Sequence, residues 1–186
     1  FERSGALGGV VRQVIPGWRI SDDAIDKDAE MLKKLGAEIR LHTQAPSVAE
    51  LKAQGYTHIF FAVGAWKAGK LDIPGNVVPV IGWLRDMKAG KDVSLGHVAV
   101  VGGGNTAMDA CRTAVRLGAK EVYVVYRRTE AEMPAEQLEI DEAREEGVIY
   151  KFLTNPAEIV GENGRVKEIK LQVMELGEPD ASGRRR

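Results

Sequence analysis

The sequence has 186 residues, of which 44% are apolar and 28% are charged, and its formal net charge is −1. This length suffices for one domain with a full core or for two small ones. The near-neutral charge argues against a nucleic acid or an anionic membrane as partner, and no apolar run approaches the roughly 18–20 residues that cross a bilayer. The single cysteine, Cys111, cannot form an internal disulfide, so we expect a reducing, cytoplasmic environment.

The first half of the chain predicts helices and strands in alternation. Residues 21–36 are typical of a helix, because Ser21 or Asp22 can cap it, lysines fill its last turn and Gly36 can end it. The other elements predicted here are a strand at 37–43, a short helix at 47–55 and a buried strand at 57–64. The turn-rich residues 65–96, with a short amphipathic piece at 80–88, are interpreted as a connection between two lobes.

The second half predicts a more regular α/β pattern. Its expected elements are a strand at 97–101, a helix at 105–117, a strand at 121–126, a helix at 134–147 with Pro134 in its first turn, a strand at 148–153 and a hairpin within 157–176. Strands that alternate with helices favour a parallel sheet, and the terminal hairpin adds an antiparallel layer.

A glycine turn joins the first strand and helix of this half. The spacing Gly102-x-Gly104-x-x-Ala107 between a strand and a helix is the dinucleotide fingerprint in its βαβ context. Gly102 permits the tight turn, Gly104 lets the backbone approach a pyrophosphate, and Ala107 lets the helix pack closely on the strand. The helix N-terminus then directs N–H groups at the phosphates. The alternative is a glycine turn that only packs a helix.

The end of the next strand bears on which nucleotide is bound. NAD sites usually place an acidic residue there to accept a hydrogen bond from the ribose 2′-hydroxyl. This sequence has Arg127 and Arg128 instead, and guanidinium groups suit a 2′-phosphate. The pattern therefore favours NADP(H), with two solvated arginines at a strand end as the alternative.

The stretches "VVGGGNTAMDACRTAVRLGAKEVYVVYRRTEAEMPA" and "MELGEPDASGRRR" closely resemble the family of the small (beta) subunit of NADPH-dependent glutamate synthase. Its relatives include the amino-terminal region of dihydropyrimidine dehydrogenase, selenate reductase subunits and, more distantly, adrenodoxin reductase. The resemblance implies an NADPH-dependent flavoprotein oxidoreductase in which an NADP(H) domain is inserted into an FAD domain. Electrons would pass from NADPH to FAD and on to the iron–sulfur clusters of another subunit or domain.

The resemblance also implies two sets of cofactor-binding residues. Those for NADP(H) are Gly102, Gly103, Gly104, Asn105, Thr106, Ala107, Arg127 and Arg128. Those for FAD are Glu2 at the ribose, Gly8, Gly9, Val10 and Arg12 at the flavin, Gln44 and Ala45 at the adenine, and Gly64 in a segment where Val63 replaces the family's usual threonine.

The expected organisation is a partial FAD-binding lobe with linker at 1–90 and an NADP(H)-binding Rossmann-like domain at 91–186. The family's first glycine fingerprint would precede Phe1 and its closing FAD segment would follow Arg186, so we expect an internal piece of a longer protein that is inactive alone. Residues 57–64 are apolar on both faces of the predicted strand, which is typical of a strand buried between neighbours. If those neighbours are missing from this piece, the exposed strand predicts association into a homo-oligomer.

Few other residues suggest chemistry. We name no catalytic residue, because cofactors carry this reaction, and expect no metal site, because one cysteine and three scattered histidines show no ligand spacing. Cys111 is interpreted as a core residue and Asp109 as a structural one. Glu132 stands out because its loop follows the arginine pair. The alternative to an enzyme is a non-catalytic module that senses a nucleotide or docks a partner.

Overall fold

The computed structural model describes residues 1–69, 71–162, 165–181, 183 and 185. The chain divides into two compact units, Phe1–Ala68 and Gly69–Arg186, which we call unit 1 and unit 2. The described residues between 69 and 90, which the sequence grouped with the first lobe, belong to unit 2. None of the described helices is long and apolar enough to cross a membrane.

Unit 1 contains the helices α1 (Gly9–Gln13), α2 (Asp22–Lys34) and α3 (Val48–Ala53). The α2 helix begins as predicted, because the Ser21 side chain accepts a hydrogen bond of 3.3 Å from the Ala24 amide. The α3 helix begins with a capping box between Ser47 and Glu50. Local capping signals thus located both predicted helices of this unit.

The strands predicted at 37–43 and 57–64 are wrong, since the described residues of unit 1 contain no β-strand. Residues 40–43 instead lie beside residues 2–4, joined by three backbone hydrogen bonds of 2.8–2.9 Å, and His42 interrupts the segment with φ of +51°. Residues 57–64 form no strand with any residue that the structure describes, and Phe60 and Val63 are 93% and 75% exposed. A buried parallel strand requires strands on both edges, and unit 1 places none beside this run.

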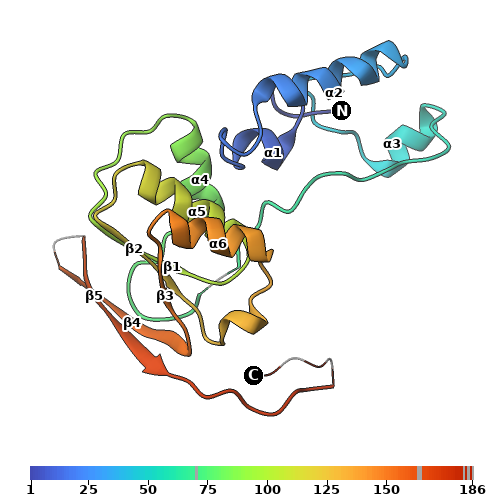
Figure 1. Cartoon of the computed structure of the whole chain (residues 1–186). Helices are drawn as coiled ribbons and strands as arrows, with labels where there is room; N and C mark the ends of the chain where they lie inside the picture. The colour runs from blue at the N-terminus through green and yellow to red at the C-terminus, as the bar shows by residue number, and fades with distance from the viewer. Residues whose placement is uncertain (70, 163–164, 182, 184, 186) are drawn as a thin grey trace. The chain divides into compact units, whose positions relative to one another are not determined.

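Unit 2 is a three-stranded parallel sheet with helices, followed by an antiparallel hairpin (Figure 1). Its elements are α4 (Val80–Lys88), β1 (His97–Val101), α5 (Asn105–Arg116), β2 (Glu121–Val125), the 3-10 turn η1 (Glu130–Glu132), α6 (Gln137–Glu145), β3 (Ile149–Lys151), β4 (Thr154–Glu162) and β5 (Arg165–Val173). The sheet order is β1-β2-β3, with Val98 opposite Val122 and Val124 opposite Tyr150. The predicted α/β fold, with a parallel sheet and an antiparallel layer, is confirmed. Residues 163 and 164 of the predicted hairpin turn lie outside the described residues.

The core of unit 2 lies between α5, α6 and the parallel sheet. Its fully buried members are Met108, Cys111 and Ala114 of α5, Val122 and Val124 of β2, and Ile140 and Ala143 of α6. The helical spacing of the α5 residues matches one face of a helix on a sheet. Burial raises the pKa of the Cys111 thiol to about 12, so this residue is the inert core residue that the sequence predicted.

The α6 helix begins at Gln137, three residues after the predicted start at Pro134. The intervening backbone is used elsewhere: the Ala135 amide donates to the Gly103 carbonyl and the Glu136 amide donates to Asn105 Oδ1, each at 3.0 Å. These two bonds hold residues 134–136 extended against the glycine turn, which is a tertiary effect that helix signals cannot reveal.

Candidate nucleotide-binding site

The glycine turn connects the end of β1 directly to the N-terminus of α5. Gly102 has φ of +137°, a value that L side chains rarely adopt, and its amide donates to the Val125 carbonyl at 3.1 Å. Gly104 is the N-cap residue of α5, and no described side chain caps this helix. The first turn of α5 also contains no acidic residue. Its N–H groups and partial positive charge therefore suit an anion.

Gly103 is buried and packs against the side chains that continue β2. A Cβ atom at this position would lie 2.9 Å from two ring carbons of Tyr126 and 3.2 Å from Met133 Cγ. Gly103 is therefore required where the glycine turn touches the arginine-bearing segment. The contact fixes the distance between the two halves of the predicted NADP site.

A short, heavily bonded turn carries the two arginines, of which Arg127 is exposed and Arg128 is partly buried. The Arg128 carbonyl accepts from the Leu153 amide at 3.1 Å, which ties this turn to the end of β3. Glu132 Oε2 accepts hydrogen bonds from the Thr129 hydroxyl at 2.5 Å and the Thr129 amide at 3.1 Å. These bonds hold the pKa of Glu132 below its ordinary value. Arg128 Nε is buried and has no hydrogen-bond partner among the residues that the structure describes.

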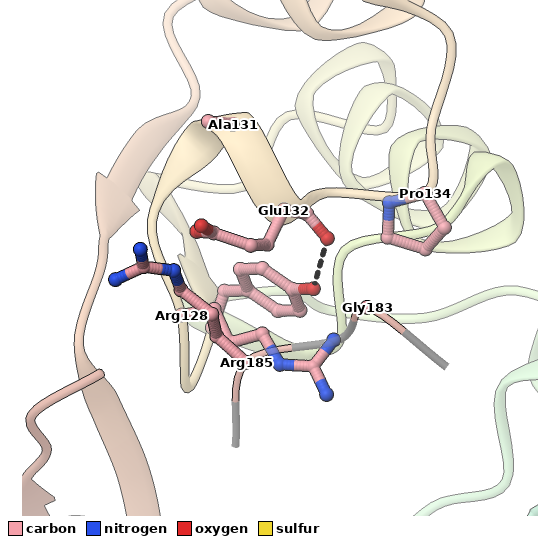
Figure 2. Close-up of a pocket in the computed structure, with 7 residues that line it drawn as sticks. Arg128, Ala131, Glu132, Pro134, Gly183 and Arg185 are labelled. Carbon is pink, nitrogen blue, oxygen red and sulfur yellow. Dashed lines mark hydrogen bonds between the residues drawn. The ribbon is translucent and has the colours of Figure 1, made fainter. Parts of the chain in front are cut away.

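A cavity of about 660 Å³ opens beside this turn (Figure 2). Its lining residues are Tyr126, Arg128, Ala131, Glu132, Pro134, Gly183 and Arg185. The Tyr126 hydroxyl donates to the Glu132 carbonyl at 2.6 Å, which fixes the aromatic ring in the cavity wall.

The structure places the glycine turn and the arginine pair after neighbouring parallel strands, at the same carboxyl edge of the sheet, and of the eight predicted NADP(H) residues Arg128 alone is among the described residues that line the cavity. Asn105 holds the segment that carries Pro134, Gly103 touches Tyr126, and Arg128 lines the cavity. Ligands of open α/β sheets bind at this edge. Sequence reasoning missed Tyr126 and Arg185, because strand periodicity assigns the first to the core and nothing local links the second to β2.

The predicted FAD residues lie in unit 1, and two of them, Gly9 and Gly64, lie beside Trp66. A Cβ on Gly64 would lie 3.3 Å from Trp66 Nε1 and 3.8 Å from Val10 Cγ2, and a Cβ on Gly9 would lie 4.0 Å from Trp66 Cζ2. Gly8 has φ of +115° and forms the N-cap of α1. Trp66 is the common neighbour of Gly9 and Gly64.

The other predicted FAD residues have protein partners or are exposed. Glu2 Oε1 accepts from the Ser4 amide and hydroxyl at 2.7 Å each, which lowers the pKa of Glu2. The Arg12 guanidinium donates to the Leu7 carbonyl at 2.6 Å and pairs with Asp26. Gln44 and Ala45 are exposed and follow the segment 40–43 that lies beside residues 2–4. Among the described residues, no group of three His, Cys, Asp or Glu side chains could hold a metal ion.

Comparisons with known proteins agree with this architecture. Residues 19–181 match the pyridine nucleotide-disulphide oxidoreductase family, and the chain belongs to that family. It is 40% identical to the NADP(+)-dependent formate dehydrogenase subunit beta of Moorella thermoacetica, covering all of this chain and 28% of that protein. It is 35% identical to the glutamate synthase [NADPH] small chain of Escherichia coli, covering all of this chain and 43% of that protein. The resemblance to the glutamate synthase small subunit is thereby confirmed.

The chain spans less than half of the length of either relative. Among solved structures, Mycobacterium tuberculosis FprA in complex with NADPH superposes with a TM-score of 0.73 at 20% identity. The superposition covers 96% of this chain and 57% of that chain. At this identity the likeness supports the fold of the chain.

Proposed function

We propose that unit 2 binds NADP(H) and that the chain forms part of a flavoprotein that passes electrons from NADPH to FAD and on to iron–sulfur centres. One observation carries the proposal: the βαβ glycine turn and a partly buried arginine meet at the same sheet edge, beside a cavity. The names of the two relatives, an NADP(+)-dependent formate dehydrogenase subunit and an NADPH glutamate synthase chain, support this choice of nucleotide.

Each part of the proposed NADP(H) site has a distinct role. The backbone from Gly102 to Thr106 and the uncapped start of α5 hold the pyrophosphate. Arg128, with its unpartnered Nε in the described structure, and the exposed Arg127 bind the 2′-phosphate. In unit 1, we assign Glu2 to the FAD ribose and the cluster of Gly9, Val10 and Gly64 to the flavin side. When bound, NADPH supplies a hydride and FAD accepts it, so the protein contributes orientation and electrostatics.

The electron acceptor is proposed to be an iron–sulfur subunit or domain. Support comes from the resemblance to the glutamate synthase small subunit and from the word "subunit" or "chain" in both relatives' names. We place the protein in the cytoplasm, since its single cysteine is buried and forms no disulfide.

A flavin-reduction assay on the full-length protein separates an enzyme from a nucleotide-sensing module. Only an enzyme loses the absorbance of its oxidised flavin on addition of NADPH.

The double change Arg127→Ala with Arg128→Ala tests the site. We expect it to remove most of a preference for NADP over NAD of roughly tenfold to a hundredfold, since charge-assisted hydrogen bonds contribute about 1.5–3 kcal/mol. NAD affinity stays nearly unchanged, because the glycine turn is untouched. Calorimetric titration of both nucleotides measures this, with Arg144→Ala as control, since Arg144 pairs with Glu130 and Asp141 outside the cavity lining. A preference that survives the double change undiminished contradicts the assignment.

A further inference from the structure

We propose that Arg185, on the loop after β5, is a third cationic contact for the 2′-phosphate and sharpens the discrimination of NADP from NAD. The proposal rests on the proposed function of unit 2. Its starting observation is that Arg185 lines the same cavity as Arg128, although the two residues lie in distant parts of the sequence (Figure 2). Neither the fingerprint nor the arginine pair points to this residue.

Backbone contacts connect the described residues of this loop to one another and to the arginine turn. The Gly183 amide donates to the Asp180 carbonyl at 2.8 Å, and Arg185 forms an isolated antiparallel bridge with Pro179. The Met174 amide at the start of the loop donates to the Leu153 carbonyl at 2.8 Å, and the Leu153 amide donates to the Arg128 carbonyl. A chain of backbone bonds therefore links the start of this loop to the arginine turn, and the loop delivers a second guanidinium to the cavity.

The charges that line the cavity favour an anion with more than one negative charge. Two arginines, Arg128 and Arg185, stand against one carboxylate, Glu132. That carboxylate is already held by both donors of Thr129 on the turn itself. The cavity thus keeps an excess of positive charge, which suits a phosphate monoester that carries close to two negative charges at neutral pH. NAD has no such group.

A purely structural role for Arg185 makes a different prediction. The charge of Arg185 also contributes to the low pKa of Glu132, so Arg185 could act only by stabilising the arginine turn. Loss of such a role would lower the melting temperature and weaken the binding of NADP and NAD to the same extent. Loss of a phosphate contact weakens NADP alone, and the effect fades as salt screens the charge.

Titration of NADP and NAD into Arg185→Ala, Arg185→Lys and Lys170→Ala variants of the chain tests the proposal. Lys170→Ala is the matched control, since it removes a cation that is 57% exposed and paired with Glu158 on the hairpin. We expect Arg185→Ala to weaken NADP by about fivefold to tenfold and NAD by less than about twofold. Arg185→Lys keeps the positive charge but not the planar guanidinium group. Its NADP affinity should therefore lie between those of the unmodified chain and of Arg185→Ala. The control matches the unmodified chain.

The outcomes separate this proposal from the proposed function. If the Arg127 and Arg128 double variant loses NADP preference while Arg185→Ala keeps it, the role of Arg185 is overturned and the site stands. Equal weakening of both nucleotides in Arg185→Ala also overturns it and assigns a structural role. If the unmodified chain shows no preference for NADP, the proposed function itself fails.

Discussion

At the scale of single residues, the contact between Gly103 and Tyr126 joins the two halves of the proposed site. The Tyr126 ring is 8% exposed and its hydroxyl is fixed on the Glu132 carbonyl. The ring therefore has little room to yield to a new atom on Gly103. The middle glycine of the three serves this packing contact, whereas Gly102 serves the backbone and Gly104 leaves the start of α5 uncovered.

Gly103→Ala should destabilise the chain by about 1–3 kcal/mol, the usual cost of an overpacked core. The new Cβ meets the Tyr126 ring at 2.9 Å, so the arginine turn shifts away and NADP affinity falls as well. Urea unfolding measures the free energy. Gly96→Ala is the control, because nothing lies within 4 Å of a Cβ there, and it should be neutral. Equal stability of the two variants would refute the packing argument.

At the scale of elements, α5 and α6 are fastened by an arginine with three carboxylate partners. The side chain of Arg112 is 7% exposed and pairs with Glu139 at 3.3 Å, with Glu146 at 2.8 Å and with Glu142. The bonds join successive turns of α6 to one point on α5. This attachment positions α6 beside the segment that lines the cavity.

Arg112→Ala should lower the free energy of unfolding by about 3 kcal/mol, because it leaves carboxylates without their buried partner. Arg112→Lys should cost less, since it retains one charge but not the multiple donors. Arg116→Ala is the exposed comparison: its side chain is 43% exposed, so its ion pair with Glu146 contributes less than about 1 kcal/mol. Chemical denaturation ranks the three variants, and a loss for Arg112→Ala no greater than that for Arg116→Ala would contradict this account.

The same cluster predicts a dependence of stability on pH. Hydrogen bonds from Arg116, and then from Arg112, hold the pKa of Glu146 below its ordinary value of 4.5. A carboxyl group with a lowered pKa in the folded state stabilises the fold above its unfolded value and loses that contribution as the pH falls through the folded value. Acid titration of thermal stability below about pH 5 should therefore be shallower for Arg116→Ala than for the unmodified chain. Parallel curves would count against the coupling.

The elements also show what sequence alone could predict. Strong local signals located α2, α3, α5 and the strands of unit 2, because caps and periodicity act within a few residues. The strands at 37–43 and 57–64 failed because a strand requires partners that unit 1 does not place there. In the site, the glycine turn and arginine pair were predictable from spacing. The late start of α6, the Tyr126 wall and Arg185 were not, since each depends on contacts between distant segments.

At the scale of the whole molecule, unit 1 exposes a run of apolar side chains within residues 57–64. Phe60 is 93% exposed, Phe61 66% and Val63 75%. Single exposed apolar side chains are ordinary, but a contiguous run of this kind favours association. The homo-oligomer predicted from the sequence therefore stays a prediction with a defined surface to test.

Light scattering of the 186-residue chain should show a mass that rises with concentration. Phe60→Ser with Phe61→Ser should shift the equilibrium toward monomer, because the change removes the apolar area that pairing would bury. Leu138→Ser serves as the control, since Leu138 on α6 is also exposed, at 66%, and lies outside this run. A constant monomeric mass over a wide concentration range would refute the prediction.

The proposed site of unit 2 recognises the extra phosphate of NADP at the arginine end of β2. The most direct measurement is calorimetric titration of NADP and NAD into the unmodified chain at low and at raised salt. We expect NADP to bind roughly tenfold to a hundredfold more tightly than NAD, and we expect raised salt to reduce this difference in affinity, because it comes from charge-assisted contacts. Equal affinity for the two nucleotides at low salt would contradict it and leave Arg127 and Arg128 as surface charge.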